Sequence, residues 1–76
     1  MNKEECFARF DYVKFWHSRT RELIANSETY SYSAFQESFR ELRRESRRAE
    51  FLLVVALYQF EQEMEEQASY GSKELR

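Results

Sequence analysis

The stretch FLLVVALY, residues 51–58, decides the fold of this 76-residue chain. Its eight apolar or aromatic residues lie between a segment rich in arginine and glutamate and a segment rich in glutamate alone. A transmembrane helix needs roughly 20 apolar residues, so this run is too short to cross a bilayer. Apolar residues on both sides of the run recur at helical spacing. The run is therefore predicted to form the middle of one long amphipathic helix.

That long helix is expected over residues 33–70. Its apolar stripe recurs at intervals of three or four residues, a near-heptad, coiled-coil-like pattern that packs helix on helix. The stripe comprises Phe35, Phe39, Leu42, Ser46, Ala49, Leu53, Ala56, Leu57, Phe60 and Met64. The chain has no proline and a single glycine, Gly71, so nothing forces the helix to break earlier. A break near residues 46–49, which would give three helices, is the alternative.

A first helix is expected over residues 3–26. Asn2 is a favourable N-cap residue, and Glu5 three residues later completes a capping box. Apolar residues at helical spacing, with Thr20 among them, form the expected inner stripe: Cys6, Phe10, Val13, Trp16, Leu23 and Ile24. Tyr12 and Phe15 lie beside this stripe, and so broad an apolar arc predicts more than one neighbour.

The connection is expected over residues 27–32, where serine, threonine and asparagine favour turns and caps. Ser33 with Gln36 forms one possible capping box for the second helix. Ser31, flanked by Tyr30 and Phe35 as a hydrophobic staple, is the other possible cap. Residues 71–76 are expected to fray. The sequence thus predicts an all-α single domain, an antiparallel two-helix hairpin.

The outward face of the second helix carries an ordered charge pattern. It runs from basic through apolar to acidic: Arg40, Arg43, Arg44 and Arg47, then Phe51, Val54, Val55 and Tyr58, then Glu61, Glu65 and Glu66. Two such helices crossing antiparallel near Val54 bring the apolar patches together and each basic end beside an acidic end, whereas parallel pairing opposes like charges. We therefore expect a homodimer, in which two hairpins form a four-helix bundle.

Size favours this dimer, because a chain so short has a marginal core and its single cysteine forms no internal disulfide. Burying each large apolar side chain contributes about 1.5–3 kcal/mol, whereas an exposed ion pair contributes about 0–1 kcal/mol. The apolar centre would supply the affinity and the charges the orientation. The alternatives are a monomeric three-helix fold that buries residues 51–58, and an outward face that docks a different protein.

The arginines of residues 40–48 admit a second interpretation, a phosphate-contacting helix in a small nucleic-acid-binding regulator. Glutamates interleaved at i,i+3 spacing, such as Glu41 with Arg44 and Glu45 with Arg48, are expected to neutralise part of this cluster. The net charge of −2 gives no general attraction to nucleic acid. Nucleic-acid binding is therefore kept as the alternative function.

The sequence contains few residues that could form a catalytic or metal-binding site. Cys6 and His17 are the only residues of their kinds and lie three turns apart on one helix, too far to share an ion. Cys6 is predicted to be a small buried hydrophobe and His17 a packed or edge residue. We expect no enzymatic activity and no cofactor. The N-terminus has no apolar signal core, and with the lone cysteine this predicts a cytoplasmic protein.

Aromatic residues make up 17% of the chain, which is more than a single helix–helix contact is expected to bury. Aromatic and arginine side chains at a surface are the usual anchors of protein interfaces. The expected partner-binding patch comprises Tyr12, Phe15, Trp16, Tyr30 and Tyr32; the alternative is that the tyrosines of the connection cap the bundle.

These features predict a non-catalytic interaction protein, an inhibitor, antirepressor or adaptor that occupies a partner's surface. No family is recognised, although the chain has the general look of accessory proteins from phages and other mobile elements.

Overall fold

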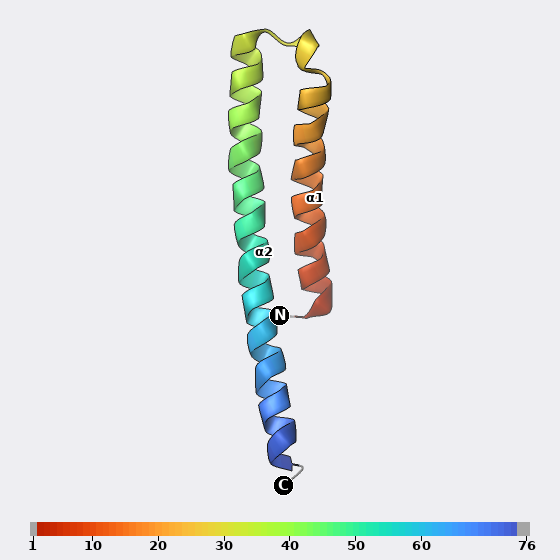
Figure 1. Ribbon diagram of the computed structural model, residues 1–76, viewed down its shortest axis with the longest axis vertical. Helices are drawn as coiled ribbons and strands as arrows, with labels where there is room; N and C mark the ends of the chain where they lie inside the picture. The colour runs from red at the N-terminus through yellow and green to blue at the C-terminus, as the bar shows by residue number, and fades with distance from the viewer. Residues whose placement is uncertain (1, 75–76) are drawn as a thin grey trace.

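The computed structural model describes residues 2–74, and every regular element in them is helical. Helix α1 spans Lys3–Ala25, a short 3-10 turn η1 spans Ser27–Thr29, and helix α2 spans Tyr32–Glu74. The two helices run antiparallel as a hairpin, and α2 continues well past the beginning of α1 (Figure 1). The molecule is a narrow rod of 67 × 15 × 12 Å. The predicted all-α, two-helix organisation is confirmed.

Helix α1 begins at the predicted cap. The Asn2 Oδ1 atom accepts a hydrogen bond from the backbone N–H of Glu5 at 2.8 Å, which satisfies one of the free donors of the first turn. At the other end, the backbone N–H and the side-chain Nδ2 of Asn26 both donate to the Glu22 carbonyl at 3.0 Å. Asn26 thereby ends the helix at Ala25, one residue before the expected boundary.

The start of α2 resolves the choice between the two possible caps. The Ser31 hydroxyl accepts from the N–H of Ala34 at 3.2 Å, and the Ser31 carbonyl accepts from the N–H of Phe35 at 2.9 Å. These are the bonds of an N-cap residue, so Ser31 caps the helix and Ser33 lies inside its first turn. Helix α2 accordingly begins at Tyr32, one residue earlier than expected.

Helix α2 is continuous through residues 46–49, so the three-helix alternative is wrong. It also passes through Gly71 and ends at Glu74, four residues beyond the expected end. A glycine inside a helix costs only about 1 kcal/mol relative to alanine, which weakens a helix without breaking it. The boundary of α2 therefore lies beyond the expected one, and residues 75–76 lie outside the described part of the chain.

The core is a narrow seam of small side chains. Ala49 and Ala56 of α2 are 0% exposed, and Cys6 and Leu23 of α1 are also buried. No large side chain in the described residues is fully buried, because two helices alone cover only one stripe of each other. Alanine in the seam lets the two backbones approach closely. The core thus holds the hairpin in register but leaves most apolar surface uncovered.

The inner stripe of α1 differs from the expected one. The covered positions alternate at three and four residues: Cys6, Arg9, Val13, Trp16, Thr20 and Leu23. Phe10 and Ile24, expected in this stripe, are exposed, and the polar Arg9 is half-buried in their place. The physical reason is that both Phe10 and Ile24 lie one residue beyond a position of the seven-residue contact repeat.

Two neighbours of Ala56 also depart from expectation. Val55 was placed on the outward face of α2, but it is half-buried, and Leu57, placed toward α1, is exposed. Each lies about 100° from Ala56 around the helix, one on either side. Helix α1 covers the side of Val55 more than the side of Leu57. The two flanks of the hairpin are therefore unlike each other.

Candidate interaction surfaces

One flank of the hairpin, here called the histidine flank, carries a contact between the helices. His17 Nε2 of α1 lies 2.8 Å from Glu50 Oε1 of α2, with both side chains about half exposed. His17 and Glu50 also line a hollow of about 460 Å³ together with Ile24 and Phe39. Phe10 shares a second hollow with His17 on α1. The flank therefore presents apolar side chains on both sides of one polar contact.

The residues of this flank follow a seven-residue repeat in both helices. Phe10, His17 and Ile24 are seven residues apart in α1, and Glu50, Leu57 and Met64 are seven apart in α2. Residues seven apart lie nearly above one another on a helix. The sequence signal for this flank is therefore a second set of residues at seven-residue spacing in each helix.

The opposite flank, here called the tryptophan flank, gathers four of the five residues predicted to bind a partner. The Tyr12 ring meets Trp16 edge-on at 6.2 Å between centroids, and Phe15 lies 5.1 Å from Trp16. Tyr30 joins Trp16 in lining a hollow of about 300 Å³ between the helices. Tyr32 does not line this hollow. Its side chain is exposed at the start of α2, and its hydroxyl accepts from Gln36 Nε2 at 3.4 Å.

The indole N–H group of Trp16 lacks a hydrogen-bond partner in this arrangement. Its Nε1 atom is buried and has no hydrogen-bond partner within residues 2–74. A buried donor without an acceptor costs about 1–3 kcal/mol. The Arg19 guanidinium lies 6.0 Å from the centre of the Phe15 ring and adds a cation at the edge of the cluster. The tryptophan flank thus combines half-covered aromatic rings, an unpaired N–H group and an arginine.

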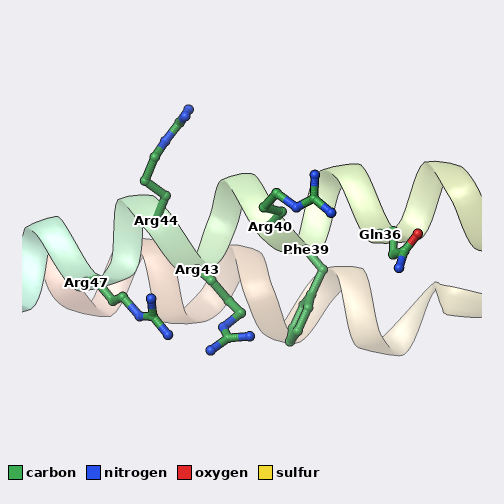
Figure 2. Close-up of a pocket in the computed structure, with 6 residues that line it drawn as sticks. All are labelled: Gln36, Phe39, Arg40, Arg43, Arg44 and Arg47. Atoms are coloured by element: carbon green, nitrogen blue, oxygen red, sulfur yellow. The ribbon is translucent and has the colours of Figure 1, made fainter.

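A basic hollow lies near the hairpin turn. Figure 2 shows the six residues that line this space of about 470 Å³: Gln36, Phe39, Arg40, Arg43, Arg44 and Arg47. Phe39, Arg43 and Arg47 extend to one side of α2, whereas Arg44 projects to the other side (Figure 2). The Arg43 guanidinium lies 5.7 Å from the centre of the Phe39 ring. The four arginines expected at a dimer contact are therefore split between two directions.

The expected i,i+3 pairs between glutamates and arginines do not form. Arg44 Nε instead lies 4.0 Å from Glu45 Oε1, on the neighbouring residue. Across the described residues, Arg40, Arg43 and Arg47 have no carboxylate within ion-pair distance. These three residues, here called the basic patch, keep their positive charge available for an acceptor outside the hairpin.

The outward face of α2 lies between the basic patch and an acidic segment. Phe51, Val54 and Tyr58 are 66%, 62% and 63% exposed. Glu61, Glu65 and Glu66 follow and are exposed as well. The order basic, apolar, acidic is therefore present on the surface, with Val55 removed from it.

Other chemistry within residues 2–74 is limited. No group of three or more histidine, cysteine, aspartate or glutamate side chains there is placed to hold a metal ion. Cys6 is buried, as predicted, and its thiol points to the Ala56 carbonyl with Sγ 3.9 Å from the oxygen. Neither helix, over the same residues, is both long and apolar enough to cross a membrane.

Comparison with known proteins gave no match to this chain among protein families, curated proteins or solved structures. The surfaces described above are therefore the basis on which a function is inferred.

Proposed function

We propose that this chain is a non-catalytic interaction protein, an inhibitor, antirepressor or adaptor that acts in the cytoplasm by occupying the surface of another protein. The observation that carries this proposal is the small, alanine-lined core beside many exposed large apolar side chains, from Phe7 in α1 to Met64 in α2. Exposed apolar surface of this extent marks interaction sites. Each large side chain buried by a partner contributes about 1.5–3 kcal/mol.

A second copy of the chain is the first partner, and together they form a four-helix bundle. The α2 helices cross antiparallel near Val54, so that exposed apolar residues meet and each basic patch faces an acidic segment. The length of α2 supports this, because Leu53 lies 21 residues from both Tyr32 and Glu74, and a crossing there leaves neither end unmatched. Such a contact is self-complementary, as a two-fold dimer requires.

The tryptophan flank is the proposed site for a different protein. Tyr12, Phe15 and Trp16 supply aromatic anchors, and Arg19 beside Phe15 supplies a charge at the rim. Aromatic and arginine side chains are enriched among the residues that dominate binding energy. Because this flank lies away from His17 and Glu50, it stays open when a second copy covers the histidine side of α2.

Nucleic-acid binding through the basic patch is the competing function. It is favoured by one observation, the lack of carboxylate partners for Arg40, Arg43 and Arg47 in the described residues. Binding of this kind weakens steeply with added salt, because each phosphate contact releases counterions. A contact dominated by apolar burial responds weakly to salt. A gel shift with generic DNA and RNA at two salt concentrations separates the two functions, and Arg43→Glu with Arg47→Glu is the control variant.

Sedimentation equilibrium of the wild type and of Val54→Glu tests the homodimer. We expect a dimer at micromolar concentration for the wild type and a monomer for the variant, because the new charge lies at the crossing. Circular dichroism should show unchanged helicity, since Val54 is exposed in the hairpin. A monomeric wild type at 100 μM, about a hundredfold above a micromolar dissociation constant, would contradict the dimer.

Affinity capture from the native host tests the protein partner. We expect one protein to be retained by the wild type and lost with Tyr12→Ala plus Phe15→Ala, because those rings are exposed on the tryptophan flank. Phe51→Ala is the control, since it removes an exposed ring from another face. Equal retention by all three proteins would rule out this flank as the binding site.

A further inference from the structure

We propose that the C-terminal part of α2 docks into the histidine flank of a second copy, beside Ile24 and Phe39. The docking segment is residues 61–74, here called the overhang because they extend past the start of α1 (Figure 1). This inference rests on the proposed homodimer and specifies which surface of the hairpin receives the second α2 helix.

The receiving groove combines an apolar floor with a basic rim. Ile24 of α1 and Phe39 of α2 line it together with Arg21, Arg43 and Arg47. The one carboxylate in its lining, Glu50, is already in contact with His17, so the three arginines leave the groove with an excess of positive charge. Ile24 is more than half exposed although it lies next to the buried Leu23. A groove of this composition fits a helix that carries an apolar side chain between carboxylates. A neutral or basic helix would leave the arginines unpaired or opposed.

The overhang has the matching composition. Met64 is 51% exposed although it belongs to the stripe that α1 covers farther along the helix. Asn2 and Lys3, at the start of α1, line a hollow with Phe60, Met64 and Gln67, and α1 begins at Lys3. Glu61 and Glu65 precede and follow Met64 in the sequence, lie beside it on one side of the helix, and are exposed. The overhang therefore presents an uncovered apolar side chain flanked by negative charge.

The register of the two helices brings these parts together. Met64 lies twelve residues after Leu52, and Phe39 lies thirteen residues before it. A two-fold axis near Leu52 thus places Met64 of one copy over Phe39 of the other, and Glu61 near Arg43. By symmetry the same contact forms at the other end of the dimer. This axis lies one residue from the midpoint of α2, so the overlap of the helices is nearly complete.

Docking on the histidine flank determines which exposed apolar residues of α2 lie in the dimer contact. Around α2, Leu57 lies on the same side as Phe39 and Met64, Val54 lies about 60° away, and Phe51 about 120° away. A second helix centred on the histidine flank covers Leu57 and reaches Val54. It leaves Phe51 at the edge of the contact. Substitutions at Met64 and at Phe51 therefore distinguish a dimer contact on the histidine flank from one on the outward face.

The first test compares Met64→Glu with Phe51→Glu by sedimentation equilibrium. Both substitutions place the same charge at an exposed apolar position of α2, so their effects on the hairpin itself are matched. We expect Met64→Glu to weaken the dimer at least tenfold and Phe51→Glu to change its dissociation constant less than threefold. The reverse ranking would overturn the flank contact while leaving the proposed homodimer intact. A monomeric wild type also overturns it and would leave the groove to an acidic helix of another protein.

The second test uses complementary charge reversal. One variant carries Arg43→Glu and Arg47→Glu, and the other carries Glu61→Arg and Glu65→Arg. We expect each variant alone to be monomeric, because every contact between its ends joins like charges. An equimolar mixture should regain a dimer of one copy each, seen by native mass spectrometry. If both variants are monomeric and their mixture forms no mixed dimer, the proposed charge pairing is wrong.

A disulfide test fixes the orientation. Ile24→Cys and Met64→Cys are made in separate chains, with Cys6 unchanged because it is buried in both. On mild oxidation of the mixture, we expect a 24–64 disulfide between chains, identified by peptide mass mapping. Oxidation of either variant alone should give no such link through the new cysteine. Efficient 64–64 linkage in the Met64→Cys variant would indicate parallel helices and refute the docking.

Discussion

Helix α2 places one apolar stripe in two environments. Where α1 lies beside it, Ala49 and Ala56 are completely covered, whereas Met64, on the same stripe, is half exposed beyond the start of α1. The apolar repeat does not change between the two regions. What changes is the presence of a neighbour. The length of α1 contributes to this difference, and the side of α2 also matters, because Leu57 is exposed although α1 lies alongside. The uncovered part of the stripe is available to another molecule.

The largest difference in stability is expected when the same charge is placed in both regions. Ala49→Glu puts an unpaired carboxylate into the seam, and we expect it to reduce the free energy of unfolding by about 3–5 kcal/mol. Ala68→Glu makes the identical change in the overhang, where the position is exposed, and should alter stability by no more than about 0.5 kcal/mol. Urea denaturation at one fixed protein concentration measures both. Equal losses would show that residue 68 is packed as tightly as residue 49.

A smaller effect is expected from truncating a large side chain of α1. Leu23 is 5% exposed, so Leu23→Ala should cost about 2–3 kcal/mol through lost apolar contact and a residual cavity. Phe7→Ala removes a larger side chain from an exposed site and should cost less than about 1 kcal/mol. Thermal melting followed by circular dichroism compares them. A costlier Phe7→Ala would mean that the outer face of α1 is buried in solution.

The smallest expected effect is the coupling between His17 and Glu50. Both side chains are about half exposed, so the contact at 2.8 Å is screened by water. A double-mutant cycle with His17→Ala and Glu50→Ala should give a coupling energy of about 0.2–1 kcal/mol. Ser18→Ala, at an exposed position next to His17, serves as the control with Glu50→Ala and should show no coupling. A coupling well above this range would mean that the histidine flank is desolvated.

The elements of the fold were predictable from local chemistry. Asn2 as the first cap follows from side-chain hydrogen bonding, and the lack of any breaker between residues 34 and 70 accounts for the unbroken α2. The choice of Ser31 over Ser33 was not predictable, because both serines have suitable neighbours. It depends on where η1 ends. Likewise, the passage of α2 through Gly71 follows from a small energy difference that a pattern of breakers does not capture.

The interaction surfaces were predicted less well than the helices. Tyr12, Phe15 and Trp16 were grouped correctly because they are close in sequence, and the structure adds Tyr30 but not Tyr32. The exchange between Val55 and Leu57 could not be foreseen. Both are apolar and equally far from Ala56, so only the position of α1 decides which one is covered. Apolar residues on nearly all sides of a helix make its inward direction ambiguous from sequence alone.

Trp16 gives this molecule a built-in optical reporter. It is the only tryptophan, and its indole is packed against Phe15 and Tyr12 on the flank that we propose as the site for another protein. Its emission therefore reads out that flank alone. A ligand seated there changes the polarity around the indole and shifts the spectrum, whereas self-association through the other flank leaves the spectrum unchanged. Trp16 emission would thus respond to a ligand on the tryptophan flank and not to association elsewhere on the chain.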